Sequence, residues 1–296
     1  MPTASVVIPT TRGGLYLRES VASVHAQTID DWEIIIVADG LDEDLSDLET
    51  DPRVRVFRQR NRGVCIARNI GVNLAASDLV AFLDDDDRAL PDRLRAQVEA
   101  MEDESVGLCH TQARVIDSDG NLVNFAGEGA RASTYPEYLR MDGLSMIGAS
   151  MVRKSVFLEL GGFNPLFRVG EDFELILRFA RESTIVFLPE VLLEVRHHEG
   201  NSWTRTTPST GQEIKIILAM HQLAASDHGE TENLRMIRKG VKSVLPARAH
   251  LALARANNAR HAHSYVKAIA AFGQAFRYAP RASVRMAIKQ LRRQRN

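Results

Sequence analysis

The stretch LVAFLDDDDRALPDRL, residues 79–94, runs from an apolar segment directly into four consecutive aspartates. Residues 79–83 have the composition of a buried strand. Four adjacent like charges repel one another, and this run would stand at the edge of a packed core. Either the aspartates meet a ligand there, or they form a solvated turn. The elements around the stretch help to decide between the two.

Strands and helices alternate along the first hundred residues. We expect strands at 4–10, 32–40, 53–59 and 79–83, and helices at 15–27, 63–77 and 91–101, the last with Pro91 at its first helical position. This alternation is typical of βαβ units and a parallel sheet, which binds ligands at the carboxyl ends of its strands. Asp39 and the run 84–87 both come at such ends. The sequence therefore favours the ligand interpretation.

The second part of the chain mixes element types. We expect two strands around an Asp-Gly turn at 107–123, a loop with a short helix at 124–145, a strand then a helix at 145–163, a helix at 171–183 and a strand at 184–189. Beyond residue 210 the pattern is helical throughout. We expect two domains, an α/β domain over 1–210 and an α-helical module over 211–296.

Composition indicates a soluble protein. The chain has 296 residues and a net charge of -1, and its only cysteines are Cys65 and Cys109. Two such distant cysteines suggest no disulfide framework, which favours a reducing cytoplasm. The N-terminus does not read as a signal peptide, and no window approaches the ~20 apolar residues of a membrane span. We expect a cytoplasmic protein, at most peripheral on the inner face of the membrane.

The small net charge hides an asymmetry. Residues 235–296 hold fifteen Lys or Arg and no Asp or Glu, which leaves 22 basic against 38 acidic residues before them. A basic module indicates an anionic partner. It could be a helical hairpin packed on the acidic body, or a surface for anionic lipid. Nucleic acid is disfavoured because the segment has few aromatics to stack on bases.

Six motifs occur in an order that resembles a known family. They are SVVIPTTRGG, QTIDDWEIIIVADG, NRGVCIARNIGV, FLDDDD, GGFNPLF followed by GEDFELILRFA, and VRHHEGNS. Together, over residues 4–203, they resemble a family 2 glycosyltransferase with the GT-A fold. The resemblance implies a mixed, mostly parallel central sheet flanked by helices. It also implies an inverting, metal-dependent transfer of a sugar from a nucleoside-diphosphate sugar, with a UDP-sugar expected, to an acceptor hydroxyl.

The family's Asp-x-Asp pattern falls on Asp84, Asp85 and Asp86. By resemblance Asp86 is the best metal ligand, Asp84 a weaker second, and Asp85 a neighbour of the ribose. Carboxylates and a diphosphate suit Mn²⁺ or Mg²⁺. The R-x-H pattern gives His198, which would complete the metal site or touch the diphosphate. We expect Asp87 to cap the turn or the following helix.

The nucleotide pocket follows from the same resemblance. Asp39 would accept a hydrogen bond from the uracil imide, although the family usually has a second acid where Ala38 stands. Pro9, Thr10 and Thr11 would line the pocket, with Thr11 in place of the family's common aromatic residue. Arg68 would bind phosphate through its fork of donors. The alternatives to these binding roles are a simple Asp-Gly turn for Asp39 and a surface ion pair for Arg68.

The catalytic base is expected at the start of the helix at 171–183. By resemblance Asp172 takes the proton of the acceptor hydroxyl, with Glu171 as the second candidate. The acceptor could be lipid-linked or a growing glycan. The product would then be a glycan, a glycolipid or a natural-product glycoside. The sequence leaves the oligomeric state open, and a homodimer is one possibility. A non-catalytic nucleotide-sugar binding protein or scaffold is the alternative, against which Asp39, Asp86 and Asp172 together argue. A nucleotidyltransferase is disfavoured because no Gly-rich phosphate loop with a trailing lysine follows the first strand.

Overall fold

The computed structural model describes residues 1–123, 132–139, 146–167, 169–198, 217–218 and 220–221. The chain divides into two compact units, Met1–Tyr138 with Asp142–Thr207 and Leu139–Met141 with Pro208–Asn296. The first unit carries the sheet and the candidate site. The helices predicted beyond residue 210 fall outside the described residues apart from a few positions, so the domain boundary at 210 stays a prediction.

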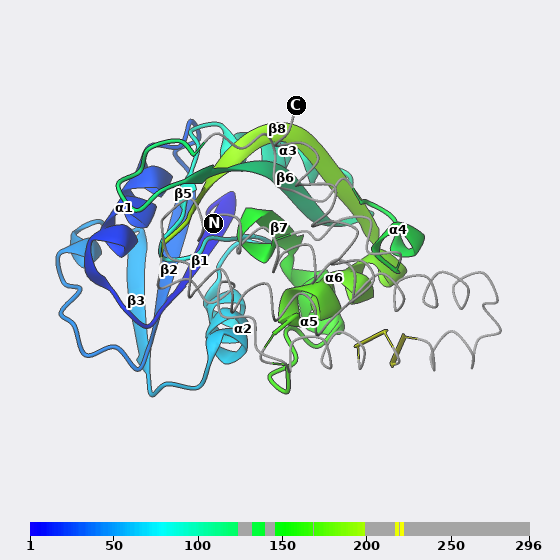
Figure 1. Ribbon diagram of the computed structural model, residues 1–296, viewed down its shortest axis with the longest axis horizontal. Helices are drawn as coiled ribbons and strands as arrows, with labels where there is room; N and C mark the ends of the chain where they lie inside the picture. Colours follow the sequence, from blue (N-terminus) through cyan, green and yellow to red (C-terminus); the bar gives the residue numbers. More distant parts are fainter. Residues whose placement is uncertain (124–131, 140–145, 168, 199–216, 219, 222–296) are drawn as a thin grey trace, which may run out of the picture. The chain divides into compact units, whose positions relative to one another are not determined.

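Within the described residues the first unit is built on one eight-stranded mixed sheet, whose long strands β6 and β8 are strongly curved (Figure 1). Its order is β3-β2-β1-β4-β7-β6-β8-β5. The strands are β1 Ala4–Thr10, β2 Trp32–Asp39, β3 Val54–Gln59, β4 Leu79–Phe82, β5 Arg88–Ala89, β6 Val106–Ile116, β7 Ser150–Arg153 and β8 Thr184–Arg196. The strands β3, β2, β1 and β4 are mutually parallel, β7 is antiparallel to β4 and β6, and β5 is antiparallel to β8. The predicted mixed, mostly parallel sheet is confirmed.

Helices cover both faces of this sheet. They are α1 Gly14–His25, α2 Val64–Leu74, α3 Arg93–Ala100, α4 Tyr135–Leu139, α5 Lys154–Glu159 and α6 Glu171–Glu182, with short 3-10 turns η1 Leu48–Thr50 and η2 Ile147–Ala149. Alternate residues of β1 serve opposite layers, because side chains of a strand alternate between faces. Val6 packs in the cluster that includes Leu17 of α1. On the other face, a Cβ at Gly71 of α2 would come within 2.3 Å of Val7 Cγ1, so glycine permits this close approach.

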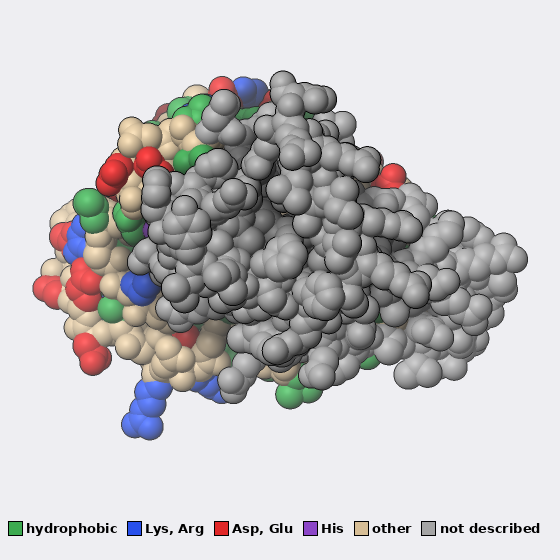
Figure 2. Space-filling view, viewed as in Figure 1, with side chains coloured by type: hydrophobic (Ala, Val, Ile, Leu, Met, Phe, Trp, Pro, Cys, Tyr) green, Lys and Arg blue, Asp and Glu red, His purple; other side chains and the backbone are tan. Residues whose placement is uncertain are grey.

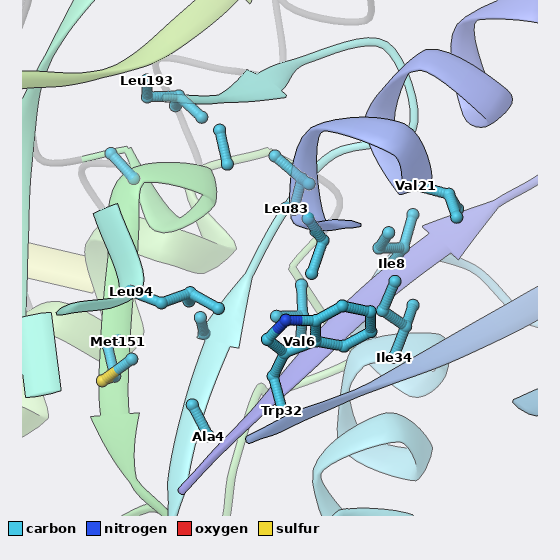
Figure 3. Close-up of a cluster of buried hydrophobic side chains, with 14 of the residues drawn as sticks. Ala4, Val6, Ile8, Val21, Trp32, Ile34, Leu83, Leu94, Met151 and Leu193 are labelled. Atoms are coloured by element: carbon cyan, nitrogen blue, oxygen red, sulfur yellow. The ribbon is translucent and has the colours of Figure 1, made fainter. Parts of the chain in front are cut away.

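The main core lies between the sheet and the layer of α1 and α3. Figure 3 shows Val6, Ile8 and Ile34 pointing toward Val21 and the indole of Trp32. All five side chains are at most 3% exposed. Continuous apolar runs in β1 and β2 therefore reflect strands that are covered on both faces. Burial at about 25 cal/mol per Å² of apolar surface makes this cluster the main source of the unit's stability.

Several predicted boundaries need correction. Pro91 lies in a turn before α3, which begins at Arg93, because Arg93 N–H is already bonded to the Leu90 carbonyl. The strand expected at 184–189 continues to Arg196, since it pairs along almost all of β6. The second strand of 107–123 reduces to one bridge between Ile116 and Leu122. The short strand β5 was not predicted, and two residues give no periodicity to detect.

The surface of the first unit carries both charges. On the face drawn in Figure 2, both acidic and basic side chains are visible over the part near α1 and β3. Within the described ranges, no helix is long and apolar enough to cross a membrane.

Candidate active site

The ends of β1 and β4 meet at the point where the strand order reverses. The chain adds β2 and β3 on one side of β1 and then places β4 on the other side. Such a switch point opens a crevice beyond the strand ends. Thr10 ends β1, and its hydroxyl donates to Asp85 Oδ2 over 2.5 Å just beyond β4. The crevice therefore contains the aspartate run.

Two aspartates of the run share one cation, the guanidinium of Arg12. Arg12 Nη2 donates to Asp85 Oδ1 over 2.9 Å and to Asp86 Oδ2 over 2.8 Å. His198 Nε2 lies 2.9 Å from the same Asp86 oxygen. Burial raises the pKa of Asp85 above its usual range. Residues far apart in sequence thus converge on one pair of carboxylates, and Arg12 was not singled out from the sequence.

A second cation pairs with the first aspartate. Arg68 of α2 is 5% exposed, and its Nη2 donates to Asp84 Oδ1 over 2.8 Å. Its Nη1 donates to Glu171 Oε1 over 3.3 Å. Burial alone would lower the pKa of Arg68, but Asp84 and Glu171 outweigh burial and raise it. Arg68 is therefore no surface ion pair: it links the aspartate run to the start of α6.

The start of α6 holds two neighbouring acids. Gly170 has a positive φ of 82° before the helix, and Phe173 N–H donates to Asp172 Oδ1 over 2.8 Å. Burial, followed by the charge of Asp172, raises the pKa of Glu171 to about 7. Burial also raises the pKa of Asp172. The positive end of the helix dipole partly offsets these effects, so carboxylates are tolerated here.

The prediction that Asp87 caps a turn or the following helix was wrong for its side chain. Asp87 is 4% exposed, and its Oδ1 accepts the Arg196 backbone N–H over 2.9 Å. Burial raises the pKa of Asp87 well above its usual range, helped by the charges of Asp84 and Asp86. Only its backbone closes the turn, donating to the Asp84 carbonyl over 3.1 Å. Asp87 therefore fastens the end of β8, and His198 beyond it, to the aspartate run.

Two buried arginines hold the backbone of the run. Arg93 is 1% exposed and donates to the Phe82 carbonyl over 2.8 Å. Arg196 is equally buried, donates from Nε to the Asp86 carbonyl over 3.0 Å and pairs with Glu19. These two cations offset the negative charge of the aspartates, and their hydrogen bonds to backbone carbonyls fix the loop. The run is thus a braced loop rather than a solvated turn.

Asp39 ends β2 inside a network of donors. Its Oδ1 accepts from Gln59 Nε2 and Arg62 N–H, both over 2.7 Å, and its Oδ2 accepts from Gly63 N–H over 2.8 Å. Three bonds leave about one acceptor position on the carboxylate. An open hollow of about 670 Å³ lies beside it, lined by residues 40–42 and 58–61. A planar base bound in this hollow would lie beside the remaining acceptor position of Asp39.

The predicted pocket residues at the end of β1 divide. Pro9 and Thr10 are buried, and Thr10 also accepts the Gly13 N–H over 3.1 Å. Thr11 is exposed. Thr10 therefore positions Asp85 and the following turn, while Thr11 is the residue left open to a ligand.

The donor set suits a hard divalent cation. Among the described residues no three His, Cys, Asp or Glu side chains already form a metal centre. However, Asp85, Asp86 and His198 converge, and a guanidinium already lies between the two carboxylates as a stand-in cation. Carboxylate oxygens with an imidazole fit Mn²⁺ or Mg²⁺ that keeps further positions for phosphate oxygens.

Comparison with known proteins shows the family to which the chain belongs. The family model described as glycosyl transferase family 2 matches residues 5–157. An uncharacterized glycosyltransferase of Rickettsia felis is 28% identical over 203 residues, 67% of this chain and 33% of that protein. The putative teichuronic acid biosynthesis glycosyltransferase TuaG of Bacillus subtilis is 30% identical over 145 residues, 47% of this chain and 58% of TuaG. The chain spans about a third of the length of the first curated relatives that it matches.

A solved structure shares the fold. It is S. aureus TarS 1–349 in complex with UDP-GlcNAc, with a TM-score of 0.68 and 16% identity over 96% of this chain and 83% of that one. The mixed, curved sheet flanked by helices is the GT-A-like α/β fold that the motifs predicted.

Proposed function

The chain belongs to glycosyl transferase family 2, and from this premise we propose that it moves a sugar from a nucleoside-diphosphate sugar to an acceptor hydroxyl. One observation carries the proposal. Two chains of contacts meet at the aspartate run, Thr10–Asp85–Arg12–Asp86–His198 on one side and Asp84–Arg68–Glu171 on the other. The second chain of contacts ends at Glu171, next to the candidate proton acceptor Asp172.

The donor would lie along these strand ends. The nucleotide base would occupy the hollow beside Asp39, and Thr11 and Asp85 would meet the ribose. TarS is solved with UDP-GlcNAc and with UDP, which supports a UDP-sugar as the first donor to test. The one remaining acceptor position of Asp39 suits the single imide N–H of uracil.

The diphosphate would lie at the cations. We assign Asp86 and His198, which lie together in the structure, to a Mn²⁺ or Mg²⁺ ion, with Asp84 as the second and weaker carboxylate that the resemblance implies. Such an ion would neutralise the charge that builds on the departing diphosphate. Arg68 would act mainly through Asp84 and Glu171, because its fork is already engaged with them. The direct phosphate contact that the resemblance implied for Arg68 stays a prediction.

Asp172 would accept the proton of the acceptor hydroxyl. Glu171 is paired with Arg68, whereas Asp172 has no ion pair within the described part of the chain. A raised pKa makes the Asp172 carboxylate a stronger proton acceptor. As the proton moves to Asp172, the acceptor oxygen attacks the anomeric carbon opposite the leaving diphosphate. Attack from that side inverts the anomeric configuration.

Two observations bear on the acceptor and on where the protein would act. The named role of TuaG supports a growing glycan as one acceptor class. The fifteen basic residues of 235–296 support a peripheral contact with anionic lipid, which would bring the site to a lipid-linked acceptor.

A donor screen by thermal shift with Mn²⁺ tests the proposal. We expect a UDP-sugar to raise the melting temperature more than the GDP- and dTDP-sugars, and chelation of the metal to reduce the effect. No stabilisation by any nucleoside-diphosphate sugar would contradict the donor class. Stabilisation without turnover would favour the non-catalytic binding protein.

A further inference from the structure

Arg12 contacts the aspartate run, but the proposed mechanism gives it no chemical role. It follows Thr11 in the turn between β1 and α1, and its side chain is 43% exposed. Even so, its guanidinium bonds to both Asp85 and Asp86, whose side chains are 10% and 9% exposed. An exposed arginine is thus folded inward onto two nearly buried carboxylates.

The contact is centred on the atom that a metal would need. Asp86 Oδ2 accepts from Arg12 Nη2 over 2.8 Å and lies 2.9 Å from His198 Nε2. Arg12 Nη1 is itself 3.4 Å from His198 Nε2. A divalent ion held by Asp86 and His198 would meet the guanidinium at the same oxygen, and two cations cannot share that position without strong repulsion.

Arg12 also differs from the other arginines of the site in its freedom to leave. Arg68, Arg93 and Arg196 are at most 5% exposed, and their removal would strand buried partners. Arg12 is followed by Gly13 and Gly14, with φ angles of 59° and 73°. Its exposed stem can turn outward about this segment. A guanidinium fork that leaves carboxylates can bind the oxygens of a phosphate instead.

We propose that Arg12 is a built-in counter-cation that competes with the divalent ion for Asp86 and moves to the donor diphosphate when metal and nucleotide bind together. The inference rests on the proposed function, because it needs the metal and the diphosphate. Its consequence is a coupling between the two ligands. The metal alone must displace Arg12 from its carboxylates, whereas a metal that arrives with a diphosphate offers Arg12 new partners.

The test measures Mn²⁺ binding to the full chain without nucleotide, by the electron paramagnetic resonance signal of free Mn²⁺. Arg12→Met keeps the length of the stem and removes the charge. We expect it to bind Mn²⁺ alone about tenfold more tightly than the wild type, at the low end of usual coupling factors. The gain in Mn²⁺ affinity on adding UDP should shrink correspondingly.

Two further variants control the result. Arg18→Met removes an arginine of α1 that pairs with Glu43 and Asp47, and should leave Mn²⁺ affinity unchanged. Arg12→Lys keeps the charge but loses the fork, and should bind Mn²⁺ alone nearly as weakly as the wild type. Circular dichroism melts establish that each variant is folded, and Arg12→Gln replaces Arg12→Met if that variant is not.

The outcomes separate this inference from the proposed function. Equal or weaker Mn²⁺ affinity in Arg12→Met overturns the inference and leaves the metal site standing, because Arg12 would then only order the carboxylates. If neither protein binds Mn²⁺ while UDP still binds, the metal dependence fails and the competition fails with it. If neither Mn²⁺ nor UDP binds the wild type, the donor proposal itself is refuted. The inference then fails as well, because no ligand competes with Arg12 for Asp86.

Discussion

Replacing Glu171 by Gln should make the protein more stable at alkaline pH and change little at acidic pH. Glu171 begins α6, and its side chain is 16% exposed beside Asp172 and Arg68. Burial and the neighbouring acid raise its pKa from 4.5 to about 7. The unfolded chain therefore loses this proton at a lower pH than the folded protein does. Between those two values, rising pH favours the unfolded state.

The magnitude follows from the difference between the two pKa values. One unit corresponds to about 1.4 kcal/mol, so a rise from 4.5 to about 7 costs up to about 3 kcal/mol once the pH exceeds 7. Below about pH 4.5 the group is protonated in both states and the cost vanishes. Gln cannot ionise and keeps the shape of the side chain. The variant should thus gain stability over the wild type as pH rises from about 5 to about 8.

Urea unfolding of the wild type and Glu171→Gln, at several pH values between about 5 and about 8, measures this difference. Glu182→Gln, at the exposed C-terminal end of the same helix with a 59% exposed side chain, is the matched control. Its difference from the wild type should stay flat across the range. A Glu171→Gln difference that is independent of pH, or larger at acidic pH, would refute the reasoning, and Glu171 would then ionise normally beside Arg68.

Two more predictions concern the aspartate run and the basic tail. Asp86→Asn should weaken Mn²⁺-dependent UDP binding by titration calorimetry with a near-normal melting temperature. Asp87→Ala should mainly lower the melting temperature, because it removes the acceptor of the Arg196 backbone N–H. Equal losses of UDP affinity would mean that the metal register is displaced by a residue. The full chain should co-sediment with liposomes that contain anionic lipid and dissociate as salt is raised, since surface charges are screened within about 10 Å at 0.1 M salt. An absence of binding at low salt would leave 235–296 as a structural or oligomer-forming module.

Much of the fold was predictable because its signals are local. Buried parallel strands such as β1 and β2 appear in the sequence as continuous apolar runs, and the helices that follow β1 and β3 have their own periodicity. The placement of Asp39 and of residues 84–87 at strand ends needed only that alternation. The antiparallel strand β5 could not be predicted from the sequence, because two residues carry no hydrophobic pattern and their partners lie in the distant strand β8.

The sequence predicted several residues that the structure brings together at the candidate site, but it predicted few of the residues that support them. Asp86 and His198 were paired from motifs 112 residues apart, and the structure brings them to 2.9 Å. Arg12 and Arg93 were missed because their partners lie in other elements and no spacing reveals them. The residue type gave no reason to expect that Arg93 is buried, because arginine is almost never fully buried without partners. The one signal was indirect, in that four adjacent aspartates near a core demand nearby cations.

Sugar transfer by this site can be tested by the release of UDP from a panel of UDP-sugars in the presence of Mn²⁺, with wild type and Asp172→Asn compared. Water can replace the acceptor in such an assay, so the sugar acceptor need not be known. We expect slow UDP release from at least one donor by the wild type, a loss of about 10²–10⁴-fold in Asp172→Asn, and nearly equal UDP affinity for both. Tight UDP-sugar binding with no release by the wild type, or undiminished release by Asp172→Asn, would contradict it.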